Sequence, residues 1–349
     1  MTGLQTVCFR AALLIAVLGL SVASAQQASP EVPIGTIDFF GLRKLSVETL
    51  RPALTLKPGD SLSPGKRPAS LDDTQRRLAA IPGVLQAQVN AVCCTDGRVS
   101  LFVGVLEEGG RTLTFHEAAR GKVRLEPGVL EAGEAFEAAL RAALQQGQAA
   151  EDDSQGHAIA SDSGLRAVQE RFIAYARTGT PRLRKVLRES ADANHRALAA
   201  QVIGYTEEKQ AVVADLVFAM RDPDSRVRNN AMRTLVVFSA MTPAEKRSVV
   251  RVPYDPFIAL LESQLFTDRN KASAALAQLT RNGDPQLLAL LRREAMIPLV
   301  EMARWNDKGH ALFAFSIVAR MAEYSDDDAL KHFFNNDRET VIAAALSRP

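Results

Sequence analysis

The stretch that decides the fold of the second half of the chain runs from Asp222 to Leu235 and reads DPDSRVRNNAMRTL. Asp224 can cap the start of a helix, because its side chain accepts a hydrogen bond from a free amide of the first turn. Val227, Ala231 and Leu235 follow at intervals of four residues and form one apolar stripe. The small side chain of Ala231 lets a second helix approach closely, so the stretch predicts a helix packed among other helices.

Other stretches repeat this pattern of an aspartate followed by apolar residues at helical spacing. Aspartates mark them at positions 192, 224, 268 and 307, which are separated by 32, 44 and 39 residues. Apolar helices are predicted between them over Glu207–Met220, Pro256–Phe266, Pro285–Arg293 and Pro298–Trp305. Pro223, Pro256, Pro285 and Pro298 sit at or near predicted helix starts, where a missing N–H costs little. Periods of about 40 residues built from helix pairs indicate a solenoid, here over residues 165–347.

This half of the chain resembles HEAT repeats, and the stretch Asp222–Ala231 carries most of the resemblance. The resemblance implies a curved array whose concave face binds other proteins or peptides. It also implies that arginines such as Arg228 bond to adjacent carbonyls or acidic groups. We therefore interpret Arg226, Arg228 and Arg233 as structural residues rather than as an anion site.

Residues 33–108 predict a small sheet with two helices. Ile34–Gly41 is a β-prone run, and Ser46 can cap a helix over Val47–Leu54. A second helix starts at Ser70 and stops before Pro82-Gly83. Two strands with alternating apolar residues follow, Ala87–Cys93 and Val99–Val105.

The register of these two strands predicts the loop between them, because opposed residues must share a face. A two-residue Asp96-Gly97 turn would oppose Asn90 to Val103. A three-residue loop, Thr95-Asp96-Gly97, instead opposes Val89 to Val103, Ala91 to Leu101 and Cys93 to Val99. We therefore expect the three-residue loop.

The order strand, helix, helix, strand, strand resembles the POTRA domain, the polypeptide-transport-associated module of bacterial envelope proteins. The residues that carry the resemblance are Ile34–Gly41 (IGTIDFFG), Ser46–Leu50 (SVETL), Leu56–Ser61 (LKPGDS), Leu71–Gln88 and Val99–Glu107. The resemblance implies that an extended chain can add to the edge strand Ala87–Cys94. The predicted polypeptide-binding residues are Gln88, Val89, Asn90, Ala91 and Val92. The alternative is that this module only packs against its neighbour.

The first residues of the chain have the pattern of a secretory signal peptide. Arg10 precedes the apolar run Ala11–Leu20, and the small-x-small sequence Ser21–Ala25 follows. We expect cleavage after Ala25, so residues 1–25 are assigned to the signal and the protein to the periplasm. An uncleaved anchor is the alternative, although ten apolar residues are short of the roughly 20 that a span needs. No other stretch predicts an integral membrane span.

Composition limits the function classes. With 349 residues, 47% hydrophobic and 23% charged, the chain predicts a folded protein of more than one domain. A net charge of +2 argues against a nucleic-acid partner. Aromatic residues make up 6%, so the cores must be built from Ala, Leu, Val and Ile.

Cys93 and Cys94 are the two cysteines that follow the signal peptide. Adjacent residues of a strand point to opposite faces, which favours one buried and one exposed thiol. The alternatives are a vicinal disulfide, or pairing with a partner, in an oxidising compartment.

Residues 109–164 predict a connector with one helix, Ala132–Gln146, and an acidic segment after it. Asp152, Asp153 and His157 are candidate metal ligands there, and an acidic linker is the alternative. No nucleophile, P-loop, dinucleotide or metalloprotease motif is present in the sequence. We therefore expect no enzyme activity and no cofactor.

Taken together, the sequence predicts an α+β protein, with a POTRA-like βααββ module joined to an all-α HEAT-like solenoid. The leading hypothesis is a secreted interaction scaffold of the bacterial cell envelope that binds proteins or peptides. The alternatives are a metal-binding factor or enzyme centred on the acidic connector, and a purely structural envelope protein.

Overall fold

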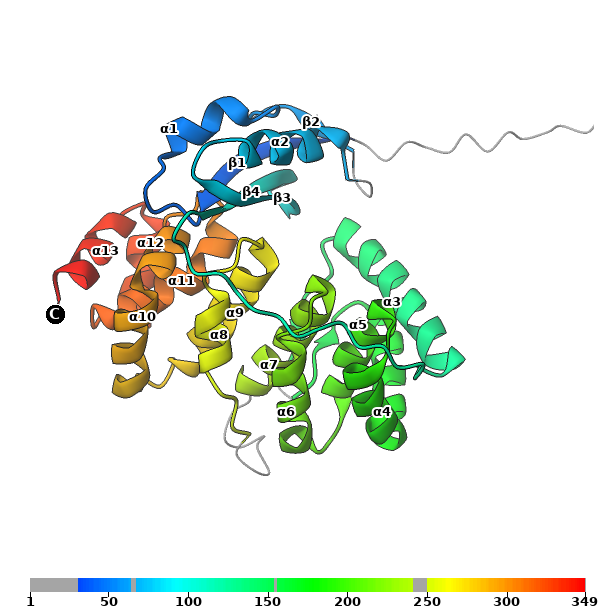
Figure 1. Ribbon diagram of the computed structural model, residues 1–349. Helices are drawn as coiled ribbons and strands as arrows, with labels where there is room; N and C mark the ends of the chain where they lie inside the picture. Colours follow the sequence, from blue (N-terminus) through cyan, green and yellow to red (C-terminus); the bar gives the residue numbers. More distant parts are fainter. Residues whose placement is uncertain (1–30, 64–66, 154–155, 241–249, 349) are drawn as a thin grey trace, which may run out of the picture.

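A computed structural model of the chain describes residues 31–63, 67–153, 156–240 and 250–348. The predicted signal peptide lies outside these residues. A small sheet with its two helices lies against the carboxyl-terminal half of a helical array (Figure 1). An extended segment then crosses the array from the sheet to its first helix.

The sheet module (residues 32–107) has the predicted order with one added short strand. Its elements are β1 (Val32–Phe40), α1 (Val47–Leu50), the 3-10 helix η1 (Arg51–Ala53), β2 (Ser61–Leu62), α2 (Ala69–Ala79), β3 (Val84–Thr95) and β4 (Arg98–Glu107). The strand order is β2-β1-β4-β3, with β1 parallel to β4 and β3 antiparallel to it. The Ser46 side chain caps α1 as expected, since it accepts from the Thr49 amide. β3 is therefore an edge strand.

The β3–β4 turn differs from the prediction. Val89 opposes Val103 and Ala91 opposes Leu101 as expected, but Thr95 pairs with Arg98. The turn thus has two residues, Asp96 and Gly97, with φ of 52° and 70°. Positive φ at both positions suits the right-handed twist of a hairpin. The extra residue is absorbed by a register shift between Val92 and Thr95, so the predicted three-residue loop is wrong although the register beyond it is right.

Helical pairs follow the sheet module, as the sequence predicted. The elements are α3 (Pro127–Gln145), the strands β5 (Glu151–Asp152) and β6 (Ile159–Ala160), α4 (Ser163–Glu189), α5 (Ala193–Val202), the 3-10 helix η2 (Ile203–Tyr205), α6 (Lys209–Ala219), α7 (Ser225–Ala240), α8 (Asp255–Leu260), α9 (Phe266–Leu279), α10 (Pro285–Ala303), α11 (Lys308–Met321), α12 (Asp326–Phe334) and α13 (Arg338–Ser347). Each even-numbered helix from α4 to α12 packs against the helix that follows it. Pro298 lies inside α10, so the two helices predicted for that region are one.

The third repeat begins three residues before the position that the sequence frame predicted. Arg196, Arg228 and Arg269 each donate to the carbonyl six residues earlier, which places them in equivalent positions. In this frame Leu265, the residue that precedes α9, corresponds to Asp224. Asp268 is instead a fully buried residue of the first turn of α9. The error arose because a buried acid and a capping acid look alike in sequence.

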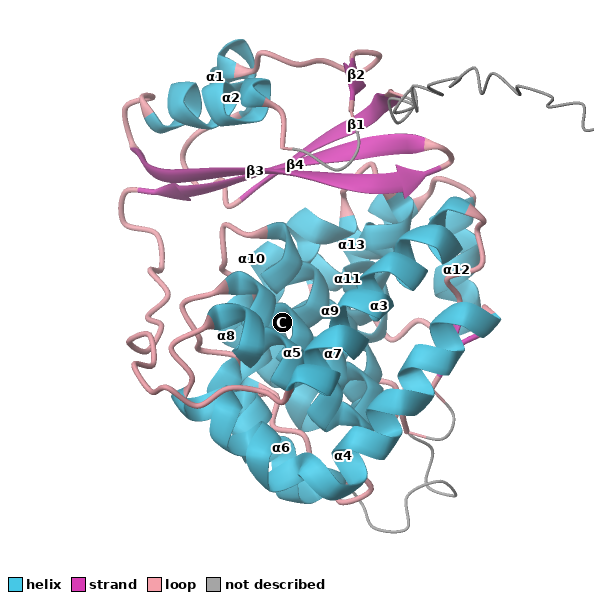
Figure 2. Ribbon diagram, turned by 90° about the vertical axis from the view of Figure 1, so that its right-hand side faces the viewer, coloured by secondary structure: helices cyan, strands magenta, loops and turns pink. Residues whose placement is uncertain are grey.

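The two faces of the sheet have different partners (Figure 2). One face packs under α1 and α2 around Leu50, Leu71 and Leu78. The other face packs on the helical array and sends Phe40 and Phe102 into the core of the array. The Phe102 ring stacks on that of Phe266 with centroids 4.0 Å apart and meets Trp305 edge-on at 4.9 Å.

Hydrogen bonds fix the orientation of the sheet on the array. The Asp38 carboxylate accepts from the main-chain amides of Asn306 and Asp307 at 2.8 and 3.1 Å. The Ser100 hydroxyl donates to the Asp307 carboxylate at 2.5 Å. Gly104 has no room for a side chain, because a Cβ there would lie 2.0 Å from the Gln264 carbonyl. Sheet and array therefore form one packed unit.

We expect Phe102→Ala to lower the free energy of unfolding by about 3–5 kcal/mol, because it leaves a cavity between the sheet and the array. Leu85→Ala, which truncates an exposed side chain of β3, should change that free energy by no more than about 0.5 kcal/mol. Chemical denaturation followed by circular dichroism measures both. Equal effects of the two substitutions would show that the interface contributes nothing specific.

Candidate functional site

The predicted polypeptide-binding residues lie on β3, at the edge of the sheet. Gln88 opposes Gly104 and Asn90 opposes Phe102 in the β4 ladder. Between them, the main chain of Val89 bonds on the side away from β4: its carbonyl accepts from Arg67 Nη1 at 2.8 Å, and its amide donates to Gln75 Oε1 at 3.4 Å. The outer edge of β3 is thus bound by two side chains at Val89, a contact that sequence reasoning missed.

The side chains of these residues divide between the two faces. Val89 is buried in the core beneath α2. Val92 packs against the core of the array, and the Asn90 carboxamide oxygen accepts from the Phe266 amide at 3.4 Å. Ala91 is exposed. Because side chains on both faces are engaged, β3 is held in place on the sheet, and among the described residues only the side chains of Arg67 and Gln75 bond to its outer main chain at Val89.

Cys93 is exposed and disulfide-bonded. The side chain of Cys94 lies outside the described part of the chain. The favoured expectation of two thiols is therefore wrong for Cys93, and its pairing with Cys94 stays a prediction.

Residues 109–126, which we call the strap, run along the turns of the first two helical pairs. The His116 amide donates to the Arg221 carbonyl at 2.9 Å. Gly121 donates to the Glu189 carbonyl and accepts from the Ala191 amide, both at 2.8 Å. A Cβ on Gly121 would lie 2.3 Å from the Glu189 carbonyl, so only glycine allows this approach.

Side chains of the strap add to these main-chain bonds. Phe115 lies under the Arg228 guanidinium, 4.1 Å from ring centroid to Cζ, and His116 stacks on Phe218 at 4.3 Å. At the end of the strap, the Leu125 amide donates to Nδ1 of His195 at 2.9 Å. The strap and the sheet module together cover the same edge of the array, which we call the turn edge (residues 190–192, 220–224, 261–265 and 304–307).

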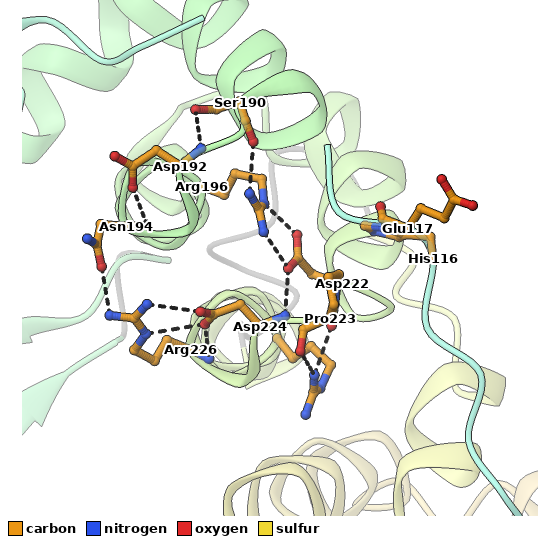
Figure 3. A network of polar contacts seen from close by, with 11 residues as sticks. His116, Glu117, Ser190, Asp192, Asn194, Arg196, Asp222, Pro223, Asp224 and Arg226 are labelled. Carbon is orange, nitrogen blue, oxygen red and sulfur yellow. Dashed lines mark hydrogen bonds and ion pairs between the residues drawn. The ribbon is translucent and has the colours of Figure 1, made fainter. Parts of the chain in front are cut away.

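Beneath the turn edge, buried arginines link successive repeats, and Figure 3 shows the first of these links, Arg196 with Asp222. Arg196 bonds to both carboxylate oxygens of Asp222 at 2.7 and 2.9 Å. Arg228 bonds to both oxygens of Asp268 at 3.1 and 2.8 Å. Arg269 continues the series with Glu301 at 2.7 Å. We call these three pairs the arginine ladder.

The arginines singled out from the sequence are structural, as predicted. Arg228 belongs to the ladder, and the exposed Arg226 pairs with Asp224 and bonds to Asn194. Arg233 pairs with Glu151 of β5. The pairing of Arg228 with Asp268 and the equivalent position of Arg269 were missed because Asp268 was assigned to a cap, which misplaced the third repeat. The sequence signal that could have revealed these pairs is the recurrence of arginine at positions 196, 228 and 269.

The structure does not assemble the candidate metal ligands Asp152, Asp153 and His157 into a site. Within the described residues, no group of three His, Cys, Asp or Glu side chains can hold a metal ion. Nδ1 of His157 lies 3.4 Å from the Lys209 ammonium, and the ring stacks on Tyr205. Burial, together with the Lys209 charge, lowers the pKa of His157 to about 4. A neighbouring cation repels a metal ion.

Comparison with known proteins supports the helical repeats. Residues 180–249 match the family described as HEAT repeats. Among solved structures, a designed armadillo repeat protein matches with a TM-score of 0.35 and 16% identity over 54% of this chain and 89% of that one. Computationally designed armadillo repeat proteins for modular peptide recognition match with a TM-score of 0.35 and 18% identity, over 53% of this chain and 93% of that one. A designed armadillo repeat protein in complex with the peptide (KR)4 matches with a TM-score of 0.34 and 16% identity, over 53% of this chain and 93% of that one.

No curated protein sequence matches the chain. Among the helices of the described residues, none has the length and apolar character to cross a membrane. The match to HEAT repeats over residues 180–249 agrees with the helical pairs and with the arginine ladder that joins them.

We expect Arg228→Ala to lower the free energy of unfolding by about 3–5 kcal/mol, because it leaves the Asp268 carboxylate buried and unpaired. Arg226→Ala is the matched control two residues away, and an exposed pair such as Arg226–Asp224 contributes about 0–1 kcal/mol. Urea unfolding of both variants measures the difference. Similar losses would refute the ladder as a stabilising element.

The pKa of His157 also predicts a pH dependence. The folded pKa of about 4 lies below the ordinary value of 6.5, so the unfolded state binds the proton more readily. The free energy of unfolding should therefore fall as the pH drops from about 6.5 towards 4, and this loss should be smaller in His157→Gln. Urea unfolding across that range tests it, and identical pH profiles for the two proteins would contradict it.

Proposed function

We propose that this chain is a secreted scaffold of the bacterial cell envelope that binds polypeptides in the periplasm. The observation that carries the proposal is the outer edge of β3, where both main-chain groups of Val89 face away from β4 and meet only side chains. An added strand bonds to such an edge through its own amides and carbonyls. The resemblance to POTRA domains and the signal-like residues 1–25 support the envelope setting.

The packing of the sheet prepares this edge for binding. Phe102 and Asp38 fix the sheet to the array, and Val89 fixes β3 beneath α2. An edge that is already ordered pays little conformational entropy when a strand is added. Main-chain bonds give affinity without demanding a particular client sequence, so the proposed clients are extended segments of envelope proteins.

The helical repeats supply the second contact in this proposal. Solenoids of helix pairs bind partners through extended concave surfaces. The turn edge is already covered by the strap and the sheet module, which leaves the surfaces formed by the helices themselves for a client. A client held at β3 and on the array at once would gain from the high local concentration of the second site.

The test of this function is Val89→Pro in the full-length protein expressed in the periplasm and crosslinked there. Proline removes the outward amide of Val89 and leaves the β4 ladder intact, because that amide faces away from β4. We expect capture of envelope polypeptides to fall about tenfold, whereas Val89→Ile, which keeps the amide, should capture them as the unmodified chain does.

Unchanged capture by Val89→Pro would refute binding through the β3 edge. No capture by any of these proteins would favour a purely structural role. Thermal unfolding of each variant, measured alongside, separates loss of binding from loss of the fold.

A further inference from the structure

Two side chains from the region of α2 cover the main chain of Val89. Arg67 lies just before α2 and donates through Nη1 to the Val89 carbonyl at 2.8 Å. Gln75 lies within α2, and its Oε1 accepts from the Val89 amide at 3.4 Å and from Arg67 Nη2 at 3.1 Å. Asp72 orients the guanidinium by accepting from its Nε at 2.5 Å. Arg67 thus supplies a donor for the Val89 carbonyl, and Gln75 supplies an acceptor for the Val89 amide.

This pattern is the one that a residue of an added strand would make. In an antiparallel pair, a hydrogen-bonded residue gives one N–H and one C=O to its partner. Arg67 and Gln75 give the same two groups to Val89 from side chains. They therefore occupy the positions that a client strand needs.

We propose that Arg67 and Gln75 form a latch on the β3 edge, and that a client strand binds Val89 only by displacing them. This inference rests on the proposed function, because it describes how binding at the same edge is regulated. The latch holds the edge closed to weak or accidental pairing and opens to a strand that replaces both bonds at once.

The latch is suited to displacement. The side chains of Arg67 and Asp72 are 42% and 52% exposed, so their ion pair is solvated and weak. Freed from Val89, the guanidinium keeps Asp72 and water as partners, and opening leaves no buried charge unpaired. The strand beneath does not move, because the Val89 side chain is buried in the core of the sheet module.

Pairing has a starting point next to the latch. Ala91 follows Val89 by two residues, so its main-chain groups face the same outer side. In the part of the chain that the structure describes, no side chain is seen to bond to the main chain of Ala91, and its own side chain is exposed. A client strand therefore pairs first at Ala91 and then replaces Gln75 and Arg67 at Val89.

The test uses a short fluorescent peptide of alternating valine and threonine with a lysine at each end, titrated against the full chain. Arg67→Ala should bind it about five- to tenfold more tightly than the unmodified protein, because displacing a charged hydrogen bond no longer opposes binding. Arg76→Ala is the matched control, since Arg76 lies on α2 and pairs only with Asp73 among the described residues. It should leave the affinity unchanged.

Gln75→Leu removes the acceptor for the Val89 amide and gives a second, independent variant. It should also tighten peptide binding, and amide hydrogen exchange at Val89 should become faster in the free protein. A peptide with N-methylated amides keeps its side chains but cannot pair, so it should bind none of the proteins.

Equal affinity of Arg67→Ala, Gln75→Leu and the unmodified chain would overturn the latch and leave the strand edge as a binding site. Binding by none of them would overturn strand addition itself and the latch with it. Binding of the N-methylated peptide, or tight binding that survives Val89→Pro in the Arg67→Ala background, would place the peptide elsewhere and refute the proposal.

Discussion

The arginine ladder is the interaction on which the rest of the structure depends. Each of its arginines bonds to a main-chain carbonyl in the turn that precedes its helix and to a carboxylate of the next repeat. Arg228, for example, bonds to the Asp222 carbonyl and to the Asp268 carboxylate. A buried guanidinium needs its partners in place, so the ladder sets the spacing and rotation of successive repeats. It thereby shapes the turn edge, on which the strap and the sheet module both lie.

The same edge explains how a small sheet can present a rigid strand. Phe115 of the strap packs on the Arg228 guanidinium, and Phe40 of the sheet lies beneath that of Arg269, 4.7 Å from ring centroid to Cζ. Two rungs of the ladder are thus capped by aromatic rings from the amino-terminal half. Stability of the repeats and placement of β3 are therefore linked through the same charged groups.

The sequence predicted local features well and long-range contacts poorly. The order of the strands, the Ser46 cap and the apolar stripe of α7 follow from short-range rules, so they were correct. The β3–β4 turn was wrong because a bulge can exchange one loop residue for one strand residue without changing the register of Val89. The Arg67 and Gln75 contacts and the docking of Phe102 join residues far apart, and no local pattern encodes them. The surroundings of the β3 edge therefore depend on contacts that only the fold shows.

The path of the strap has a consequence for how the protein folds. Repeat arrays ordinarily behave as chains of neighbours, in which units can be added, removed or unfolded from one end. Here the segment before the first helices carries a module that packs on α9, α10 and α11, near the other end. The sheet module and the repeat formed by α10 and α11 are therefore joined by direct contacts, although the first helical repeats lie between them in sequence. Contacts between residues so far apart in sequence slow folding, because the chain between them must be brought together before the contacts can form.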